Sequence, residues 1–249
     1  MCTVTWLRAD DGYELFCNRD ERHERGEAWP PAVHEEDGVH FAAPTDPDGG
    51  GTWIVVNSHG LALCLLNGYA QADDLLPAAS FTSRGLLVRE LATARSPDDV
   101  ALRLGTRSLA GFRSFRLLVL AAGRPACAAV WDRATSRLTR ESPELPLISC
   151  PVRTDEVRAA RRDTLLRLVA EHGALDGTVL AAFHRSRHPA GWIWSVSMQH
   201  DVARTRSHSH VKVTAERVEF VYTPGRPCST RPLPVVAFAR AAAGNTSET

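Results

Sequence analysis

The sequence is short of the features that mark several common protein classes. Only Lys212 among its 29 basic residues is a lysine, and 29 acidic residues balance them to a formal net charge of zero. Without a basic excess, the chain has no electrostatic footprint for nucleic acid or for an anionic membrane. No apolar run approaches the roughly 20 residues that span a bilayer. We therefore expect no nucleic-acid partner and no membrane span.

The N-terminus lacks a secretory signal, and the cysteines lack a pairing pattern. Charges at Arg8, Asp10 and Asp11 interrupt the region where an apolar signal segment would lie. The six cysteines are scattered through the chain without a CxxC pair, which favours reduced thiols over a disulfide framework. We therefore predict a cytoplasmic protein, and no motif in the sequence indicates a cofactor.

A hairpin is predicted at the N-terminus, and it carries a candidate nucleophile. Residues 2–8 alternate apolar and polar side chains, residues 9–12 have turn chemistry, and residues 13–17 form the return strand. Cys2 directly follows the initiator methionine, so removal of Met1 leaves a free α-amine on the residue that carries the thiol. With an unperturbed pKa of roughly 7.7–8.0, that amine can serve as the base for its own side chain.

The return strand is followed by Asn18-Arg19-Asp20-Glu21, which would come back beside this thiol. Arg19 would lower the pKa of the thiol and hold a substrate carbonyl or carboxylate. Asp20 would orient the α-amine through a hydrogen bond. On their own, four polar residues after an apolar strand usually form a solvated turn. Their expected position beside Cys2 favours the catalytic interpretation.

Asn67 ends a second apolar stretch, at residues 61–66, and precedes a glycine. Its side-chain amide could donate a hydrogen bond to a developing oxyanion, and losing one such donor typically costs about 10²–10³ in rate. An asparagine before a glycine is also typical of a turn in the left-handed conformation. Both interpretations stay open from the sequence.

The remaining pattern predicts strands towards both ends of the chain, with helices between them. Strands are expected at residues 52–56, 61–66, 115–121, 126–131, 137–139, 146–149, 192–199, 205–213 and 217–222. Helices are expected at residues 82–94, 96–104, 154–171 and 178–184. Residues 22–51 indicate a charged loop with one short strand at 39–43, and residues 224–249 a poorly ordered tail. We predict one domain over residues 1–223, with an α+β fold of two sheets face to face and helices outside.

These motifs together resemble the NRDE family, which includes the transport and Golgi organisation protein 2 proteins. The resemblance rests on Met1-Cys2, on Asn18-Arg19-Asp20-Glu21, which names the family, and on Gly50-Gly51-Thr52-Trp53. Leu66-Asn67-Gly68-Tyr69 resembles the family's Thr-Asn-Tyr element with one residue inserted, and Ser83-Arg84-Gly85 also recurs there. These features span roughly residues 1–90, and the match beyond them is looser.

The family in turn resembles N-terminal-nucleophile hydrolases, especially bile-salt hydrolases and penicillin V acylases. That resemblance implies a four-layer αββα sandwich of two antiparallel sheets and cleavage of a C–N bond other than a peptide bond. Its implied catalytic residues are Cys2 as nucleophile, Arg19 and Asp20 beside the thiol, and Asn67 at the oxyanion. The late arginine of the hydrolases is matched by Arg206, and we predict that Asn18 and Arg206 bind substrate. Ser149 stands where the hydrolases have a second asparagine, and serine is a poorer substitute for an amide donor.

We predict a cysteine amidohydrolase that cleaves the amide C–N bond of a small acylated substrate. The alternative is a non-enzymatic NRDE-family protein in trafficking, lipid handling or haem transfer, in which Cys2 is structural or contacts a ligand. A further alternative is a metal site at His200, His208 and His210, because the last two would share one face of a strand. No cysteine or carboxylate joins these histidines at metal-ligand spacing, so we expect no metal.

Overall fold

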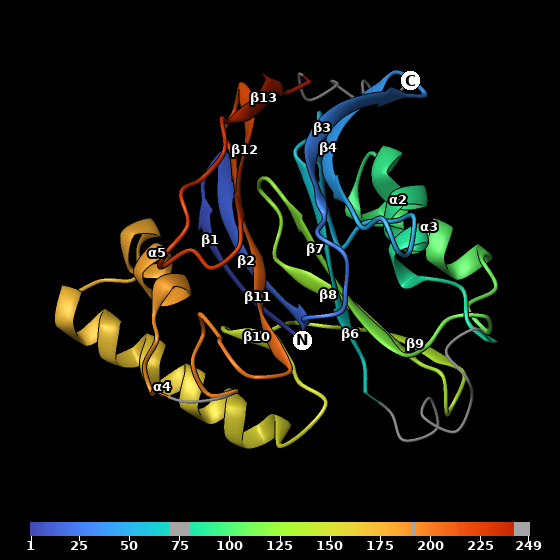
Figure 1. Ribbon diagram of the computed structural model, residues 1–249. Helices are drawn as coiled ribbons and strands as arrows, with labels where there is room; N and C mark the ends of the chain where they lie inside the picture. The colour runs from blue at the N-terminus through green and yellow to red at the C-terminus, as the bar shows by residue number, and fades with distance from the viewer. Residues whose placement is uncertain (70–79, 191–192, 242–249) are drawn as a thin grey trace.

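The chain forms four layers in the computed structural model, which describes residues 1–69, 80–190 and 193–241 (Figure 1). Two antiparallel sheets face each other in the middle. One is covered by α4 (Thr154–His172) and α5 (Gly177–Arg185). The other is covered by α2 (Arg84–Glu90), the short 3-10 helix η2 (Leu91–Thr93) and α3 (Pro97–Thr106). The predicted αββα sandwich of the α+β class is confirmed.

The first sheet, sheet A, has the N-terminal hairpin near its centre. Its strands lie in the order β10 (Leu147–Ser149), β1 (Cys2–Ala9), β2 (Gly12–Arg22), β11 (Ala203–Val213), β12 (Arg217–Pro224) and β13 (Val236–Ala239). The hairpin of β1 and β2 is confirmed, with Cys2 opposite Arg19 in the register. Helices cover the outer face of the sheet, so both faces of these two strands are buried.

The second sheet, sheet B, is built from the middle of the chain. Its strands lie in the order β3 (Trp29–Glu36), β4 (Val39–Thr45), β5 (Ile54–Asn57), β6 (Leu61–Asn67), β7 (Phe115–Ala121), β8 (Cys127–Asp132) and β9 (Arg137–Glu141). Neighbouring strands are antiparallel throughout. Almost every step along this sheet is therefore a hairpin or a short connection, as the sequence pattern indicated.

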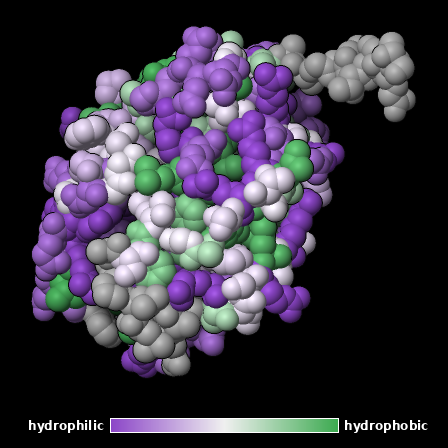
Figure 2. Space-filling model, turned by 90° about the vertical axis from the view of Figure 1, so that its right-hand side faces the viewer, coloured by the Kyte–Doolittle hydropathy of each residue, from purple (hydrophilic) through white to green (hydrophobic). Residues whose placement is uncertain are grey.

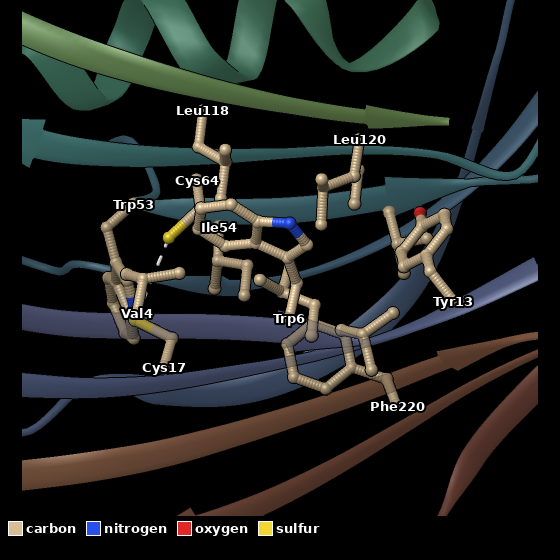
Figure 3. Packing of buried hydrophobic residues seen from close by; sticks show 14 of the residues in the cluster. Val4, Trp6, Tyr13, Cys17, Trp53, Ile54, Cys64, Leu118, Leu120 and Phe220 are labelled. Carbon is tan, nitrogen blue, oxygen red and sulfur yellow. Dashed lines mark hydrogen bonds between the residues drawn. The ribbon is translucent and has the colours of Figure 1, made fainter. Parts of the chain in front are cut away.

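The main hydrophobic core lies between the two sheets. Alternation along β1 turns Val4 and Trp6 towards sheet B, where they join a buried cluster with residues of β5, β6 and β7. Figure 3 shows Trp6 pointing from sheet A towards Leu118 and Leu120 of sheet B. Thr3 and Thr5 occupy the other face of β1 and are buried under the helices. The same alternation decides which face each functional residue of the hairpin occupies.

The helices turn apolar stripes to the sheets and polar residues to solvent. Leu87 and Val88 of α2, with Val100 and Leu104 of α3, are buried against sheet B. Figure 2 views this side of the molecule, where hydrophobic and weakly polar residues gather within a hydrophilic surround. No helix in the described ranges is long and apolar enough to cross a membrane.

Two strands occupy much of the segment that was predicted to be a loop. We expected only a short strand at residues 39–43, but β3 and β4 form a hairpin over most of 29–45. The WPP sequence that suggested a loop lies in β3, at the edge of sheet B. An edge strand tolerates proline because one row of its N–H groups has no partner strand, and the register is irregular between Trp29 and Ala32.

Two predictions for the C-terminal third are wrong. Residues 193–199 form turns and an isolated bridge from Gln199 to Arg204, although their alternation predicted a strand; Trp192 lies outside the described residues. The alternation instead reflects burial of Ile193, Val196 and Met198 beneath the helices. We predicted a poorly ordered tail from residue 224 onward, but this segment contains β13, which pairs with β12. Residues 242–249 lie outside the described part.

Candidate active site

Cys2 begins β1 and its side chain faces the space between the sheets. It pairs with Arg19 of β2 on one side and with Ser149 of β10 on the other. The residue is 9% exposed and lies on the wall of a cavity of about 440 Å³. Arg19 and Asn67 line the same cavity, which we call the Cys2 cavity. The structure thus brings together Cys2, Arg19 and Asn67, which are three of the four predicted catalytic residues. The fourth, Asp20, follows Arg19 in β2 and lies on the opposite face of that strand.

Met1 occupies the position where the catalytic amine would have to form. Its ammonium group donates to the Asp20 carbonyl at 2.9 Å, and the Asp20 N–H donates to the Met1 carbonyl at 2.8 Å. Burial acts to lower the pKa of this ammonium, but electrostatic interactions with Tyr69, Cys2 and Glu21 outweigh it and raise the pKa to about 11. With Met1 present, the nitrogen of Cys2 is an amide that donates to the Ser149 hydroxyl at 3.2 Å. A base on Cys2 itself requires removal of Met1.

The thiol of Cys2 belongs to a line of three buried cysteines. Its hydrogen bond with Cys17 and its burial raise the pKa of the Cys2 thiol well above its usual value. Cys17 in turn lies 3.7 Å, sulfur to sulfur, from Cys64 of the opposite sheet. We expected Arg19 to lower the pKa of Cys2, and in the chain that carries Met1 that prediction is wrong. The thiol is held protonated and is a poor nucleophile in this form.

Arg19 lies inside the Cys2 cavity but shares its charge with two carboxylates. Its guanidinium stacks on the Trp53 ring, 4.5 Å from the centroid. One of its nitrogens lies 3.7 Å from Glu21 and 3.6 Å from Asp46. At 4% exposure the side chain has little freedom. This arrangement presents a fixed guanidinium edge to the cavity, which suits a substrate carbonyl or carboxylate.

Asp20 faces the helix layer, on the opposite side of β2 from Arg19. Its carboxylate accepts from the Thr205 hydroxyl at 2.6 Å and lies 3.7 Å from Arg161. The second oxygen, Oδ2, has no hydrogen-bond donor among the described residues. Burial raises the pKa of Asp20, while the positive charge of Arg161 acts in the opposite direction.

Sequence reasoning missed Arg161, the fully buried partner of Asp20. This residue of α4 donates to the carbonyls of Ile193 and Ser195, both at 3.0 Å, and to the Thr3 hydroxyl. A signal was present, since Arg161 falls at helical spacing on the apolar stripe between Val157 and Leu165. A lone cation on a buried stripe predicts a buried acidic or carbonyl partner.

Asn67 ends β6, opposite Phe115 of β7. The alternative interpretation, a left-handed turn, is wrong because Asn67 is not among the described residues with a positive φ. Its side chain lines the Cys2 cavity and makes no hydrogen bond with any other residue that the structure describes. The amide is therefore available to a ligand at this position.

The two predicted substrate-binding residues lie outside the Cys2 cavity. Asn18 is fully buried under α5, where its amide donates to the carbonyls of His184 and Val196. Its oxygen accepts from His184 at 3.0 Å and from His208 at 2.8 Å. All hydrogen-bonding positions of the Asn18 side chain are therefore used within the protein. Asn18 thus has a structural role, and the prediction that it binds substrate is not supported. Arg206 lies in a bulge of β11 and lines a different cavity.

The three histidines that formed the alternative metal site do not converge. His208 is bound to Asn18, and His210 lies 2.8 Å from Glu14. Within residues 1–69, 80–190 and 193–241, no group of three or more histidine, cysteine, aspartate or glutamate side chains is placed to hold a metal ion.

The four-layer sandwich, with β1 as an inner strand of sheet A, is the fold of N-terminal-nucleophile hydrolases, and solved structures of that class resemble it. A variant of conjugated bile acid hydrolase from Clostridium perfringens gives a TM-score of 0.57 at 10% identity, covering 99% of this chain and 100% of that one. An N-acylethanolamine-hydrolyzing acid amidase ortholog from Caenorhabditis elegans gives 0.55 at 11%, covering 84% and 92%. Penicillin V acylase from Agrobacterium tumefaciens gives 0.52 at 13%, covering 90% and 83%.

The sequence comparison identifies the family. The model of the Transport and Golgi organisation 2 family matches residues 1–151, so the chain belongs to that family. No curated protein matches the chain by sequence. At 10–13% identity the solved structures establish the fold alone.

Proposed function

We propose that the protein is a cysteine amidohydrolase that cleaves the amide C–N bond of a small acylated substrate. The observation that carries the proposal is the position of Cys2, at the start of a central strand and on the wall of a cavity shared with Arg19 and Asn67. Removal of Met1 converts the Cys2 nitrogen from an amide to an amine at this position. The residue then carries both nucleophile and base.

The reaction would proceed through a thioester on Cys2. The α-amine takes the thiol proton as the sulfur attacks the carbonyl carbon, and the Asn67 amide donates to the oxyanion that forms. The C–N bond then breaks as the α-amine returns the proton to the leaving nitrogen. Water hydrolyses the thioester, releasing the acyl group as a carboxylic acid and restoring the thiol. Arg19 holds a carbonyl or carboxylate of the substrate at the cavity wall.

The non-enzymatic alternative has its own supporting observation. With Met1 in place, two backbone hydrogen bonds hold it to Asp20, and the Cys2 thiol is protonated. If Met1 stays on the protein, the chain has the fold without the catalytic amine. Cys2 then contributes to the cavity wall only, and the protein would bind a ligand without turning it over.

One experiment separates the two. Mass spectrometry of the purified protein gives the N-terminal residue, and a thiol-directed acyl probe followed by peptide mapping gives the labelled cysteine. The hydrolase proposal expects Cys2 at the N-terminus, labelling at Cys2, and hydrolysis of some member of an N-acyl amide panel that Cys2→Ser abolishes. Cys228→Ser is the matched control, because Cys228 is the exposed thiol. Intact Met1 together with an unlabelled Cys2 refutes the hydrolase.

A further inference from the structure

A second cavity, of about 280 Å³, lies away from the candidate active site. None of its lining residues lines the Cys2 cavity. Its wall carries three arginines: Arg204 and Arg206 from β11 and Arg226 from the turn after β12. Glu27 is the one carboxylate in that wall. Three positively charged residues and one negatively charged residue therefore line this cavity.

These three arginines have no carboxylate within ion-pair distance among the described residues. Arginines elsewhere in the described chain commonly pair with a carboxylate, whereas none of these three has an ion pair with a described residue. The buried Nε atoms of Arg204 and Arg226 also lack a hydrogen-bond partner among the described residues. A buried polar atom without a partner calls for an explanation, and a bound ion is one such explanation.

A backbone irregularity changes the direction of one of these arginines. A β-bulge lies between Thr205 and Ser207 of β11, and Arg206 is the extra residue in it. Bulges re-aim a side chain at the cost of a local break in the ladder. Two of the guanidinium groups are also anchored, since Arg206 donates to the Arg25 carbonyl at 2.9 Å and Arg226 to Gln199 at 3.5 Å. Anchored guanidinium groups lose less freedom when an anion binds.

We propose that this cavity binds a phosphate group, either as the free ion or on a small phosphate ester. A guanidinium offers paired N–H donors that match two oxygens of a phosphate, so three of them can surround a tetrahedral anion. The cavity lies just below the roughly 300–1,000 Å³ typical of drug-sized ligands, so the ester must be small. Thr205 lines this cavity and donates to Asp20.

The test is binding of inorganic phosphate, which does not depend on the proposed hydrolase activity. Thermal unfolding is measured in phosphate and in chloride at equal ionic strength, and calorimetry titrates inorganic phosphate and, separately, glycerol phosphate. Arg204→Gln and Arg226→Gln each remove one guanidinium. Arg8→Gln is the matched control, because Arg8 is exposed and lines neither cavity.

We expect phosphate to raise the unfolding temperature of the wild type and of Arg8→Gln equally. Each of the other two variants should lose at least about tenfold in affinity, the effect of losing one or more hydrogen bonds to a charged group. Binding of glycerol phosphate as well as the free ion identifies the ester as ligand, and binding of the ion alone identifies phosphate itself. Equal stabilisation of all four proteins would be a general effect of the salt, and it overturns the proposal, as does no binding by the wild type.

Discussion

The Asp20–Arg161 pair provides the most direct test of how the helix layer supports the candidate site. Both side chains are fully buried, one on β2 and one on α4. Arg161→Met keeps much of the side-chain volume and removes the charge. After the substitution, the Asp20 carboxylate keeps only the hydrogen bond from the Thr205 hydroxyl. The Ile193 and Ser195 carbonyls lose the hydrogen bonds that Arg161 donates to them.

The expected cost is large compared with the stability of a domain. Removing one partner of a buried ion pair costs about 3–5 kcal/mol, because the other charge stays buried without compensation. Total unfolding free energies are typically about 5–15 kcal/mol. At roughly 2–4 °C per kcal/mol for a chain of this size, the unfolding temperature should fall by roughly 6–20 °C.

The pH dependence distinguishes lost charge compensation from lost packing. Arg161 acts to lower the pKa of Asp20, so the variant should raise it further. Above that pKa the variant must bury an uncompensated carboxylate, and below it the neutral acid costs far less. The deficit of Arg161→Met relative to wild type should therefore shrink as the pH falls and grow as the pH rises. Denaturant unfolding from about pH 4.5 to 8 measures this difference in unfolding free energy. In a double-mutant cycle, the cost of Arg161→Met should be smaller when Asp20 is replaced by Asn. A deficit that is independent of pH refutes the electrostatic account.

Further predictions concern other parts of the molecule. Burial lowers the pKa of His208 to about 3, so its contribution to stability is present above the unfolded value near 6.5 and is lost as the pH falls below it. His208→Gln should flatten the acid branch of a pH–stability curve by up to roughly 1.4 kcal/mol per pH unit, and an unchanged branch contradicts the assignment. A Cβ at Gly51 would overlap the backbone of the first turn of α2, so Gly51→Ala should lose about 1–3 kcal/mol in thermal unfolding. Gly105→Ala, in open space within α3, should instead gain about 0.5–1 kcal/mol. Cys17→Ala removes the hydrogen bond that most raises the pKa of the Cys2 thiol, so iodoacetamide should alkylate Cys2 faster near pH 8, and an equal rate would show that burial alone governs the thiol.

The sequence predicted the hairpin and the partners of Cys2 but not how far β2 extends. We ended the strand at residue 17, and the structure continues it to Arg22. Side chains in a strand alternate between faces, so the longer strand sends Arg19 and Glu21 towards the Cys2 cavity and Asn18 and Asp20 towards the helices. Apolar periodicity could not show this, because polar residues buried on both faces of a strand carry no amphipathic signal.

Long-range pairing explains the other omissions. Arg161 lies 141 positions after Asp20, and Arg206 was matched by its order along the chain without regard to register. Arg206 lies at the bulge of β11 and lines the second cavity, which no local pattern indicates. Residue types at the chain start therefore predicted that Arg19 lies beside Cys2, whereas side-chain partners set by packing between layers required the structure.

Removal of Met1 is the step on which the candidate site depends, and it changes the hydrogen bonds around Asp20 and Cys2. Loss of Met1 breaks the two backbone hydrogen bonds that tie it to Asp20 and exposes a new ammonium at Cys2. That ammonium already has one acceptor in place, since the Ser149 hydroxyl lies 3.2 Å from the nitrogen. Ser149 would then hold the catalytic amine, so the residue that departs from the hydrolases' asparagine would still have a place in the reaction.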